Sequence, residues 1–184
     1  ASLGIGPGDE VILADSNWVA TMAPVIHLGA TPVLVDIDEA SWCIDPESVR
    51  FAISRRTRAI IVTHLYGNVA NVQQIAKVAI DAGIPFIEDA AEAIGSRFHG
   101  QHVGTFGVAA VFSFHGTKTV AAGEGGAVVT NDASLRDRML VLNQHGRSLE
   151  NAREFAPSIL GYKFKISNIQ AALLVGQVSR IEEL

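Results

Sequence analysis

Short apolar runs alternate along this chain with segments whose apolar residues recur every three or four positions. The run at 59–65 (AIIVTHL) is nearly continuous in apolar residues, which is typical of a strand buried on both faces. By contrast, the apolar positions of 71–82 have helical spacing, which predicts a helix that ends at Gly83. Strands that alternate with helices in this way predict an α/β fold whose sheet is covered by helices on both faces.

The same signals place the remaining elements. One helix is expected to begin with Asp45 as its N-cap and Pro46 as its first residue, positions that these residue types favour. We find no internal repeat, low-complexity tract or linker in the sequence, so it predicts one compact unit. The further strands are expected at 10–15, 32–36, 85–89, 108–114 and 126–130, and the further helices at 18–28, 134–143 and 168–184.

Composition and charge narrow the class of protein. Of the 184 residues, 48% are apolar and 18% are charged, which is the balance of a globular domain. The 14 basic and 19 acidic residues give a net charge of −5 without a basic cluster, so binding to nucleic acid over a broad face is not expected. The single Cys43 excludes an internal disulfide and fits a reducing compartment. Without a signal peptide or an apolar run of roughly 20 residues, a cytoplasmic location is expected.

Two charged residues follow apolar strands in positions that suit cofactor chemistry. Lys118 lies in a glycine-rich loop after the strand at 108–114, and Asp89 ends the strand at 85–89. The carboxyl ends of strands form the ligand-binding edge of an open α/β sheet. Pyridoxal phosphate (PLP) chemistry needs a lysine for a Schiff base and an aspartate that pairs with the pyridine nitrogen. We therefore predict a PLP site with Lys118 as its catalytic residue and Asp89 as the ring partner.

Each residue of this set also has a simpler interpretation. A lysine in a glycine-rich loop is usually a solvated surface residue. An aspartate after a strand is often a helix N-cap, for which Glu92 would complete a capping box. Ser113 could donate its hydroxyl to a phosphate or be a small residue of a buried strand. Trp18 could stack on a planar ring or pack in the core.

The spacing of the glycine, lysine and histidine residues does not match three other kinds of site. A P-loop needs an adjacent glycine and lysine, but one residue separates Gly116 from Lys118. A dinucleotide fingerprint needs its glycines between a strand and a helix, whereas those at 4–8 precede the first strand. No spacing typical of a metal site is found among the histidines, which are expected to be structural or substrate-facing. The histidines considered are His64, His115 and His145.

Several segments, taken together and in order, resemble one protein family. The set is similar to the DegT/DnrJ/EryC1/StrS family of sugar aminotransferases over essentially the whole chain. Two of its segments, FHGTKT and GYKFK, look most similar to GDP-perosamine synthases, which aminate GDP-4-keto-6-deoxymannose. The segments are GDEVI (8–12), VDID (35–38), HLYG (64–67), EDAAEAIG (88–95), FSFHGTK (112–118), GEGG (123–126) and GYKFKISNIQAA (161–172).

The resemblance implies a fold-type-I PLP enzyme with a mixed seven-stranded sheet, which acts as a homodimer with sites at the subunit interface. It makes Lys118 the Schiff-base lysine and Asp89 the partner of the pyridinium nitrogen. It also implies that Trp18 stacks on the cofactor ring, that Glu92 lies near the ring and that Ser113 binds the phosphate.

Two departures from the family pattern affect what we expect of the phosphate ligands and of the part of the protein that 1–184 represents. Many members carry an Asn that reaches the phosphate across the dimer, and Lys163 stands at that position, where its cation is expected to bind the phosphate instead. The family also has a preceding segment with a Gly-Thr turn and a small C-terminal domain, neither of which is found in 1–184. We therefore expect 1–184 to be the central part of the PLP-binding large domain.

The resemblance implies a reaction in which glutamate gives its amino group to a nucleotide-linked 4-keto-6-deoxy sugar, as in the biosynthesis of polysaccharides such as O-antigen. The alternatives are a 3-aminotransferase or a dehydratase of the same family that acts on another nucleotide sugar, and a catalytically silent fragment of the fold. A dehydratase branch carries histidine in place of the lysine, and Lys118 therefore argues against it.

Overall fold

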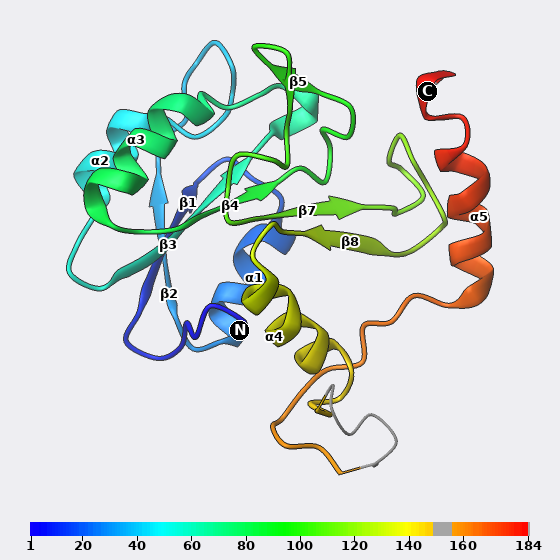
Figure 1. Cartoon of the computed structure of the whole chain (residues 1–184). Helices are drawn as coiled ribbons and strands as arrows, with labels where there is room; N and C mark the ends of the chain where they lie inside the picture. The colour runs from blue at the N-terminus through cyan, green and yellow to red at the C-terminus, as the bar shows by residue number, and fades with distance from the viewer. Residues whose placement is uncertain (149–155, 184) are drawn as a thin grey trace.

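The computed structural model describes residues 1–148 and 156–183. Its main sheet has six strands in the order β2-β1-β3-β4-β7-β8, and all neighbours are parallel except β7 and β8 (Figure 1). The predicted α/β fold with a mixed, mostly parallel sheet is confirmed. Within the described residues, this sheet has one strand fewer than the seven that the resemblance implied.

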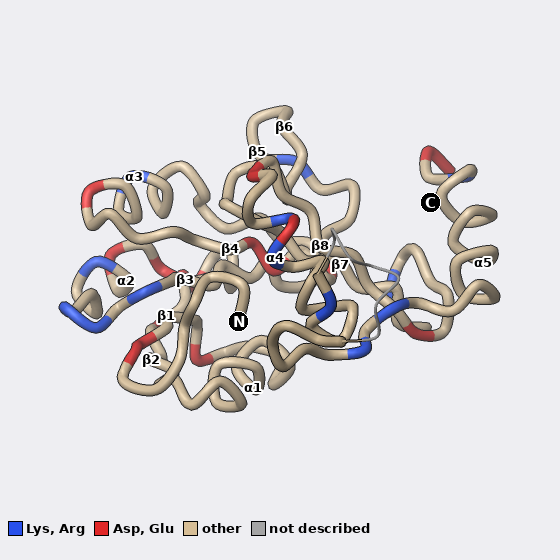
Figure 2. Tube along the Cα trace, turned by 60° about the horizontal axis from the view of Figure 1, so that its bottom comes forward, with Lys and Arg blue, Asp and Glu red and all other residues tan. Residues whose placement is uncertain are grey.

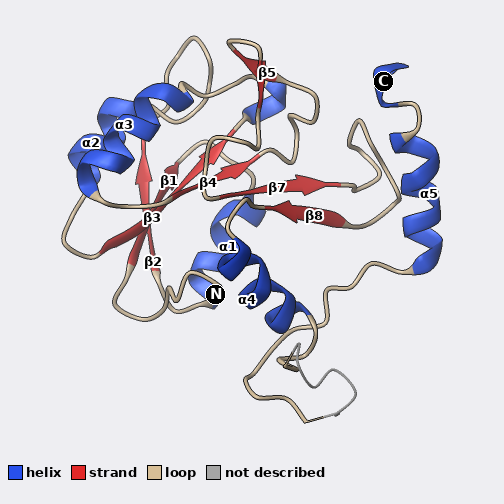
Figure 3. Cartoon of the chain, in the orientation of Figure 1, coloured by secondary structure: helices blue, strands red, loops and turns tan. Residues whose placement is uncertain are grey.

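The predicted strands and helices occur in the expected order, and they alternate as far as β4 (Figure 3). In the part of the chain that the structure describes, no helix separates the strands from β4 to β8, and α4 and α5 follow them. The strands of the sheet are β1 (Glu10–Ala14), β2 (Thr31–Val35), β3 (Thr57–Thr63), β4 (Phe86–Asp89), β7 (Ala109–Ser113) and β8 (Gly126–Val129). The α-helices are α1 (Val19–His27), α2 (Pro46–Ala52), α3 (Val72–Ala82), α4 (Ala133–Asn143) and α5 (Asn168–Val178). Two 3-10 turns are η1 (Leu65–Gly67) and η2 (Ile181–Glu183).

The two faces of the sheet carry separate buried cores. The pairing of β1 with β3 places Ile12 beside Ile60 and Val11 beside Ala59. Ile12 and Ile60 belong to the larger core, which the residues of α2 and α3 complete. Val11 and Ala59 point to the opposite face and pack with Val25 of α1. Because successive side chains of a strand point to opposite faces, strands covered on both sides are apolar throughout, as the run at 59–65 indicated.

Helix boundaries follow the predicted signals. The side chain of Asp45 accepts hydrogen bonds from the backbone N–H groups of Glu47 (3.2 Å) and Ser48 (3.0 Å), so it caps α2. Gly83 ends α3 with a φ of 66°, in the left-handed region where a side chain would be strained. Both signals were read correctly from the sequence.

Three local features differ from the sequence prediction. The last helix, expected over 168–184, ends at Val178 as α5, because the chain turns at 179–180 before the separate 3-10 turn η2. Strand β3 ends at Thr63 and not at residue 65, because the chain turns at Tyr66 and Gly67, whose φ values are 53° and 84°. A small antiparallel hairpin of β5 (Arg97–Phe98) and β6 (Gln101–His102) follows β4 and was not predicted. Strands of two residues are too short to produce a detectable hydrophobic period.

Charged residues are distributed over several elements of the molecule, including α2, α4 and the loops (Figure 2). Some form ion pairs at the surface, such as Arg58 Nε with Asp9 Oδ1 at 3.3 Å and Arg50 Nε with Glu47 Oε1 at 3.4 Å. Among the helices that the structure describes, none is both long and apolar enough to cross a membrane.

Candidate active site

The carboxyl ends of β3, β4 and β7 share one edge of the sheet, because these strands are adjacent and parallel. Asp89 is the last residue of β4, and Ser113 is the last residue of β7. The loop that follows β7 carries Lys118. The fold therefore brings Asp89 and the Lys118 loop to the same edge, which is where ligands bind in open α/β sheets.

An ion pair joins the loop after β4 to the loop after β7. Lys118 Nζ lies 2.9 Å from Oε1 of Glu92, and the backbone N–H of Tyr66 donates to Oε2 of the same carboxylate (3.0 Å). Burial raises the pKa of Glu92, but the hydrogen bonds from Lys118 and Tyr66 and the positive charge of Lys118 outweigh it and hold the pKa below its ordinary value. Only 20% of the Lys118 side chain is exposed, so it is not the solvated surface lysine of the simpler interpretation.

The carboxylate of Asp89 is oriented by α1. Its Oδ2 accepts a hydrogen bond from the hydroxyl of Thr21 at 2.6 Å, and its Oδ1 accepts one from the backbone N–H of Ala91 at 3.2 Å. Residues 90–95 form turns and no helix. The alternative in which Asp89 caps a helix and Glu92 completes a capping box is therefore not what the structure contains.

The polar residues that support Asp89 were not predicted from the sequence. Asn17 donates through Nδ2 to the hydroxyl of Thr63 at the end of β3 (2.8 Å), and Asn17 Oδ1 lies 3.3 Å from the Thr21 hydroxyl. These residues connect β3, α1 and the end of β4. Their position after β1 and at the end of β3 could have drawn attention to them, since both places lie at the carboxyl edge.

The remaining predicted residues lie in different surroundings. Trp18 is the N-cap residue of α1 and is 72% exposed, so it is not part of the core. Ser113 Oγ accepts a hydrogen bond from the backbone N–H of His115 at 3.3 Å, which leaves its own proton available to a ligand. Lys163 is exposed, and its backbone bridges to Gln144 at the end of α4. It is carried by a different part of the molecule from the elements that hold Lys118.

Main-chain hydrogen bonds close the loop of Lys118 at its base. The N–H of Phe114 donates to the carbonyl of Gly125 (2.8 Å), and the N–H of Gly116 donates to the carbonyl of Gly123 (2.9 Å). Val120, within the loop, is fully buried. The loop is therefore a packed structure with both ends fixed to the β7–β8 pair.

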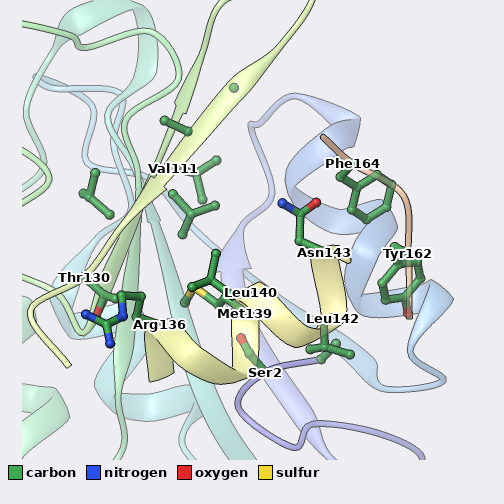
Figure 4. Close-up of a pocket in the computed structure, with 15 residues that line it drawn as sticks. Ser2, Val111, Thr130, Arg136, Met139, Leu140, Leu142, Asn143, Tyr162 and Phe164 are labelled. Carbon is green, nitrogen blue, oxygen red and sulfur yellow. The ribbon is translucent and has the colours of Figure 1, made fainter. Parts of the chain in front are cut away.

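A separate hollow of about 710 Å³ lies between β8 and α4 (Figure 4). Its lining is mainly apolar and includes Leu140, Tyr162 and Phe164, with Arg136 and Asn143 as polar groups. Lys118, Asp89 and Glu92 do not line it, so it is distinct from the candidate site. Across 1–148 and 156–183, no three His, Cys, Asp or Glu side chains gather as a metal site would require.

The groups at the sheet edge fit a PLP cofactor by their chemistry. An amine, a carboxylate already oriented by a hydroxyl, a free serine hydroxyl and an exposed indole are the groups that PLP enzymes use to hold the aldehyde, the ring nitrogen, the phosphate and the ring face. The side chains of this chain that match these groups by type are those of Lys118, Asp89, Ser113 and Trp18.

Comparison with known proteins extends over the whole chain. The model of the DegT/DnrJ/EryC1/StrS aminotransferase family matches residues 1–184. GDP-perosamine synthase of Escherichia coli O157:H7 is 39% identical over 182 residues, which cover 99% of this chain and 50% of that protein. A putative L-glutamine:3-amino-2,3-dideoxy-scyllo-inosose aminotransferase of Streptomyces kanamyceticus is 40% identical over 183 residues, which cover 100% of this chain and 44% of that protein. The chain thus spans about half the length of the curated relatives that it matches.

Solved structures agree with the family match. The structure of 3-amino-5-hydroxybenzoic acid synthase superposes with a TM-score of 0.94 at 35% identity, over 99% of this chain and 48% of that one. NtdA of Bacillus subtilis, solved with bound PMP as cofactor, superposes with a TM-score of 0.91 at 30% identity, over 99% of this chain and 41% of that one. The chain therefore has the large-domain architecture of fold-type-I aminotransferases and belongs to the PLP-dependent DegT/DnrJ/EryC1/StrS aminotransferase family.

Proposed function

We propose that the protein transfers an amino group from glutamate to the keto carbon of a nucleotide-linked 4-keto-6-deoxy sugar. The observation that carries this proposal is the placement of Lys118, paired with Glu92, at the same sheet edge as the hydroxyl-bound carboxylate of Asp89. The similarity to GDP-perosamine synthase supports the nucleotide sugar as the acceptor and the 4-position as the site of amination.

The residues at the edge have separate roles in this proposal. Lys118 would hold the cofactor covalently through Nζ and, once released, would move a proton at Nζ between the cofactor and the carbon of the bound substrate. Asp89, held by Thr21, keeps a proton on the ring nitrogen. Glu92 orients the amine of Lys118. When bound, PLP supplies the sink for the electrons of the carbon–hydrogen bond that is broken.

The remaining contacts of the cofactor are proposals of the same kind. Trp18 stacks on the ring, and Ser113 donates to the phosphate. We propose that the protein is a cytoplasmic homodimer with shared sites, in which 1–184 is the central part of the large domain. Lys163 then serves the phosphate of a second copy, which is consistent with its attachment to the segment beside α4.

Replacement of the lysine tests the proposal directly. In the whole protein, Lys118→Ala should abolish the yellow colour of bound PLP and lower turnover by a factor of about 1,000 or more, because covalent catalysis and proton transfer are both lost. Lys77→Ala, which removes an exposed lysine from α3, is the matched control and should behave as wild type. Borohydride reduction followed by peptide mapping should place the label on Lys118. A label on another residue, or full turnover by Lys118→Ala, would refute the assignment.

Analysis of the reaction product would identify the acceptor substrate. Whole protein supplied with glutamate and a panel of keto-sugar nucleotides should aminate a GDP-linked 4-keto-6-deoxy sugar, and NMR should locate the new nitrogen at C4. A nitrogen at C3 would support a 3-aminotransferase, and a 3-deoxy sugar without nitrogen would support a dehydratase. An absence of product with every acceptor would support the catalytically silent alternative.

A second candidate acceptor comes from the comparison with the inosose aminotransferase, which is as similar as the perosamine synthase. That relative is named for glutamine as the donor and for a keto-cyclitol as the acceptor. The panel should therefore include 3-amino-2,3-dideoxy-scyllo-inosose as an acceptor and glutamine as a donor. Preference for this pair over glutamate and the GDP-sugar would replace the proposed substrate while leaving the role of Lys118 unchanged.

A further inference from the structure

A buried carboxylate lies directly beside Asp89 in the chain and takes no part in the proposed chemistry. The side chains of Glu88 and His64 are both fully buried, and His64 Nε2 lies 3.1 Å from Oε2 of Glu88. The backbone N–H of Ala70 donates to Nδ1 of His64 at 3.3 Å, so the ring proton is on Nε2 and is donated to Glu88. His64 is thus a donor to this carboxylate through Nε2.

Glu88 also holds the turn that leads into β7. Its Oε1 accepts hydrogen bonds from the backbone N–H groups of Phe106 and Gly107, both at 2.7 Å, and its Oε2 accepts one from Gly104 at 2.7 Å. Burial raises the pKa of Glu88, but the hydrogen bonds from His64 and from these three N–H groups outweigh it and lower the pKa below its ordinary value. These four donors around Glu88 form what we call the cradle.

The cradle fits its carboxylate because two of its residues are glycine. At Gly104, where φ is +89°, a Cβ atom would lie 2.6 Å from Cζ of Phe112. At Gly107 it would lie 2.7 Å from the carbonyl oxygen of Phe86. Both distances are too short for any side chain, so the close approach of this turn to β4 and β7 requires glycine at both positions.

The same contacts determine where Asp89 points. The pairing of β3 with β4 places Glu88 beside Val62 and Asp89 beside Thr63, so the two carboxylates lie on opposite faces of the sheet. His64 binds both residues, because its side chain donates to Glu88 and its backbone N–H donates to the carbonyl oxygen of Asp89 at 3.0 Å. A shift of β4 by one residue would exchange the two faces and break every one of these contacts.

We propose that Glu88 and His64 are positioning residues, which hold the carboxylate of Asp89 in place for the cofactor without touching the cofactor themselves. The proposal rests on the proposed role of Asp89. The cradle fixes the end of β4 and thereby the face from which Asp89 acts. A displacement of about 1 Å caused by a residue remote from the chemistry can cost about 100-fold, so loss of one donor to Glu88 should have a measurable effect.

Two substitutions of His64 separate its two side-chain contacts. His64→Gln keeps an N–H donor toward Glu88, whereas His64→Asn keeps an acceptor for the N–H of Ala70 and loses that donor. We expect the Kd for PLP of the whole protein, measured by absorbance titration, to rise about tenfold or more in His64→Asn and less than about threefold in His64→Gln. Val78→Ala, which weakens the buried core of α2 and α3 without touching the cradle, should leave the Kd unchanged.

Hydrogen exchange gives a readout that needs no PLP. In the cofactor-free protein, the amides of 103–107 should exchange about tenfold faster or more in His64→Asn than in wild type, while those of α2 keep the wild-type rate. A weakened cradle with unchanged PLP affinity would overturn the positioning role, and so would an equal loss of affinity in Val78→Ala or His64→Gln. Failure of the wild-type protein to bind PLP would instead refute the proposed function, and the positioning role with it.

Wild-type protein alone supplies a test if the His64 variants do not fold. Coupling between two sites is reciprocal, so PLP should stabilise the cradle as much as the cradle favours PLP. Addition of PLP should therefore slow exchange in 103–107 by about tenfold more than in α2. Equal slowing of the two segments, or none, would contradict the proposal.

Discussion

Carboxylates that are close together in the sequence lie in different surroundings at the candidate site. Glu88 and Asp89 are neighbours in the chain, yet the first lies fully buried among four donors and the second faces the hydroxyl of Thr21. Glu92, three residues further on, is paired with Lys118. Three carboxylates within five residues thus lie in three different environments: one is fully buried, one is bound by a hydroxyl and one is paired with an amine.

Glu92 provides a residue-scale prediction on pH. Its pKa is lower in the folded chain than in the unfolded one, so its stabilising contribution is present above the unfolded value of about 4.3 and is lost as the pH falls through the folded value. Glu92→Gln should lower the free energy of unfolding by about 0.5–1 kcal/mol at pH 7, since the ion pair is partly exposed. Urea unfolding at pH 7 and pH 3 measures the difference, which should be smaller at pH 3 because the carboxylate is then closer to protonation. A difference as large at pH 3 as at pH 7 would show that the ion pair is not its cause.

Part of the site could be predicted from single residues and part could not. Lys118 and Asp89 each follow an apolar strand, and strand ends in a parallel sheet meet at one edge, so their common location was accessible from the sequence. The contact of Thr21 with Asp89 spans 68 residues of sequence, and that of His64 with Glu88 spans 24. Such contacts depend on strand register, which a hydrophobic pattern read along one chain does not determine.

At the scale of elements, the N-cap of α2 provides a prediction on stability. Asp45 binds two backbone N–H groups at the start of α2, a helix of only seven residues. Asp45→Ala should destabilise the protein by about 1 kcal/mol, because the first turn of α2 loses its cap. Asp45→Asn retains the acceptor oxygen and should cost less than half as much. Chemical denaturation of both variants tests this, and equal losses would show that the charge, and not the cap, is what matters.

Elements with local signals were predicted better than those without. The caps at Asp45 and Gly83 lie next to the residues they serve, and both were correct. The end of β3 was misplaced because His64 and Leu65 continue its apolar run, although the backbone turns at Tyr66. The resemblance implied a mixed sheet, but no signal in the sequence indicated that β8 is the strand that runs antiparallel to its neighbour β7. In these cases tertiary contacts override the local pattern.

At the scale of the whole molecule, two of the buried cores lie on opposite faces of the sheet. Val78 lies in the core beneath α2 and α3, and Val25 lies in the core beneath α1. Each change to alanine should cost about 2 kcal/mol, and the two costs should add to within about 0.5 kcal/mol because the cores do not share side chains. Val49→Ala combined with Val78→Ala, both within one core, is the matched comparison and should deviate from additivity by more. Strong coupling between Val25 and Val78 would argue against separate cores.

The closure of the loop after β7 has a mechanical consequence for Lys118. The segment is tied at both ends to one antiparallel pair, through Ser113 opposite Gly126 and through the bond from Phe114 to Gly125. Because the backbone is anchored in this way, Nζ of Lys118 can move only by rotation about the bonds of its own side chain. In the proposed reaction, the length of that side chain therefore limits how far apart successive partners of the amine can lie.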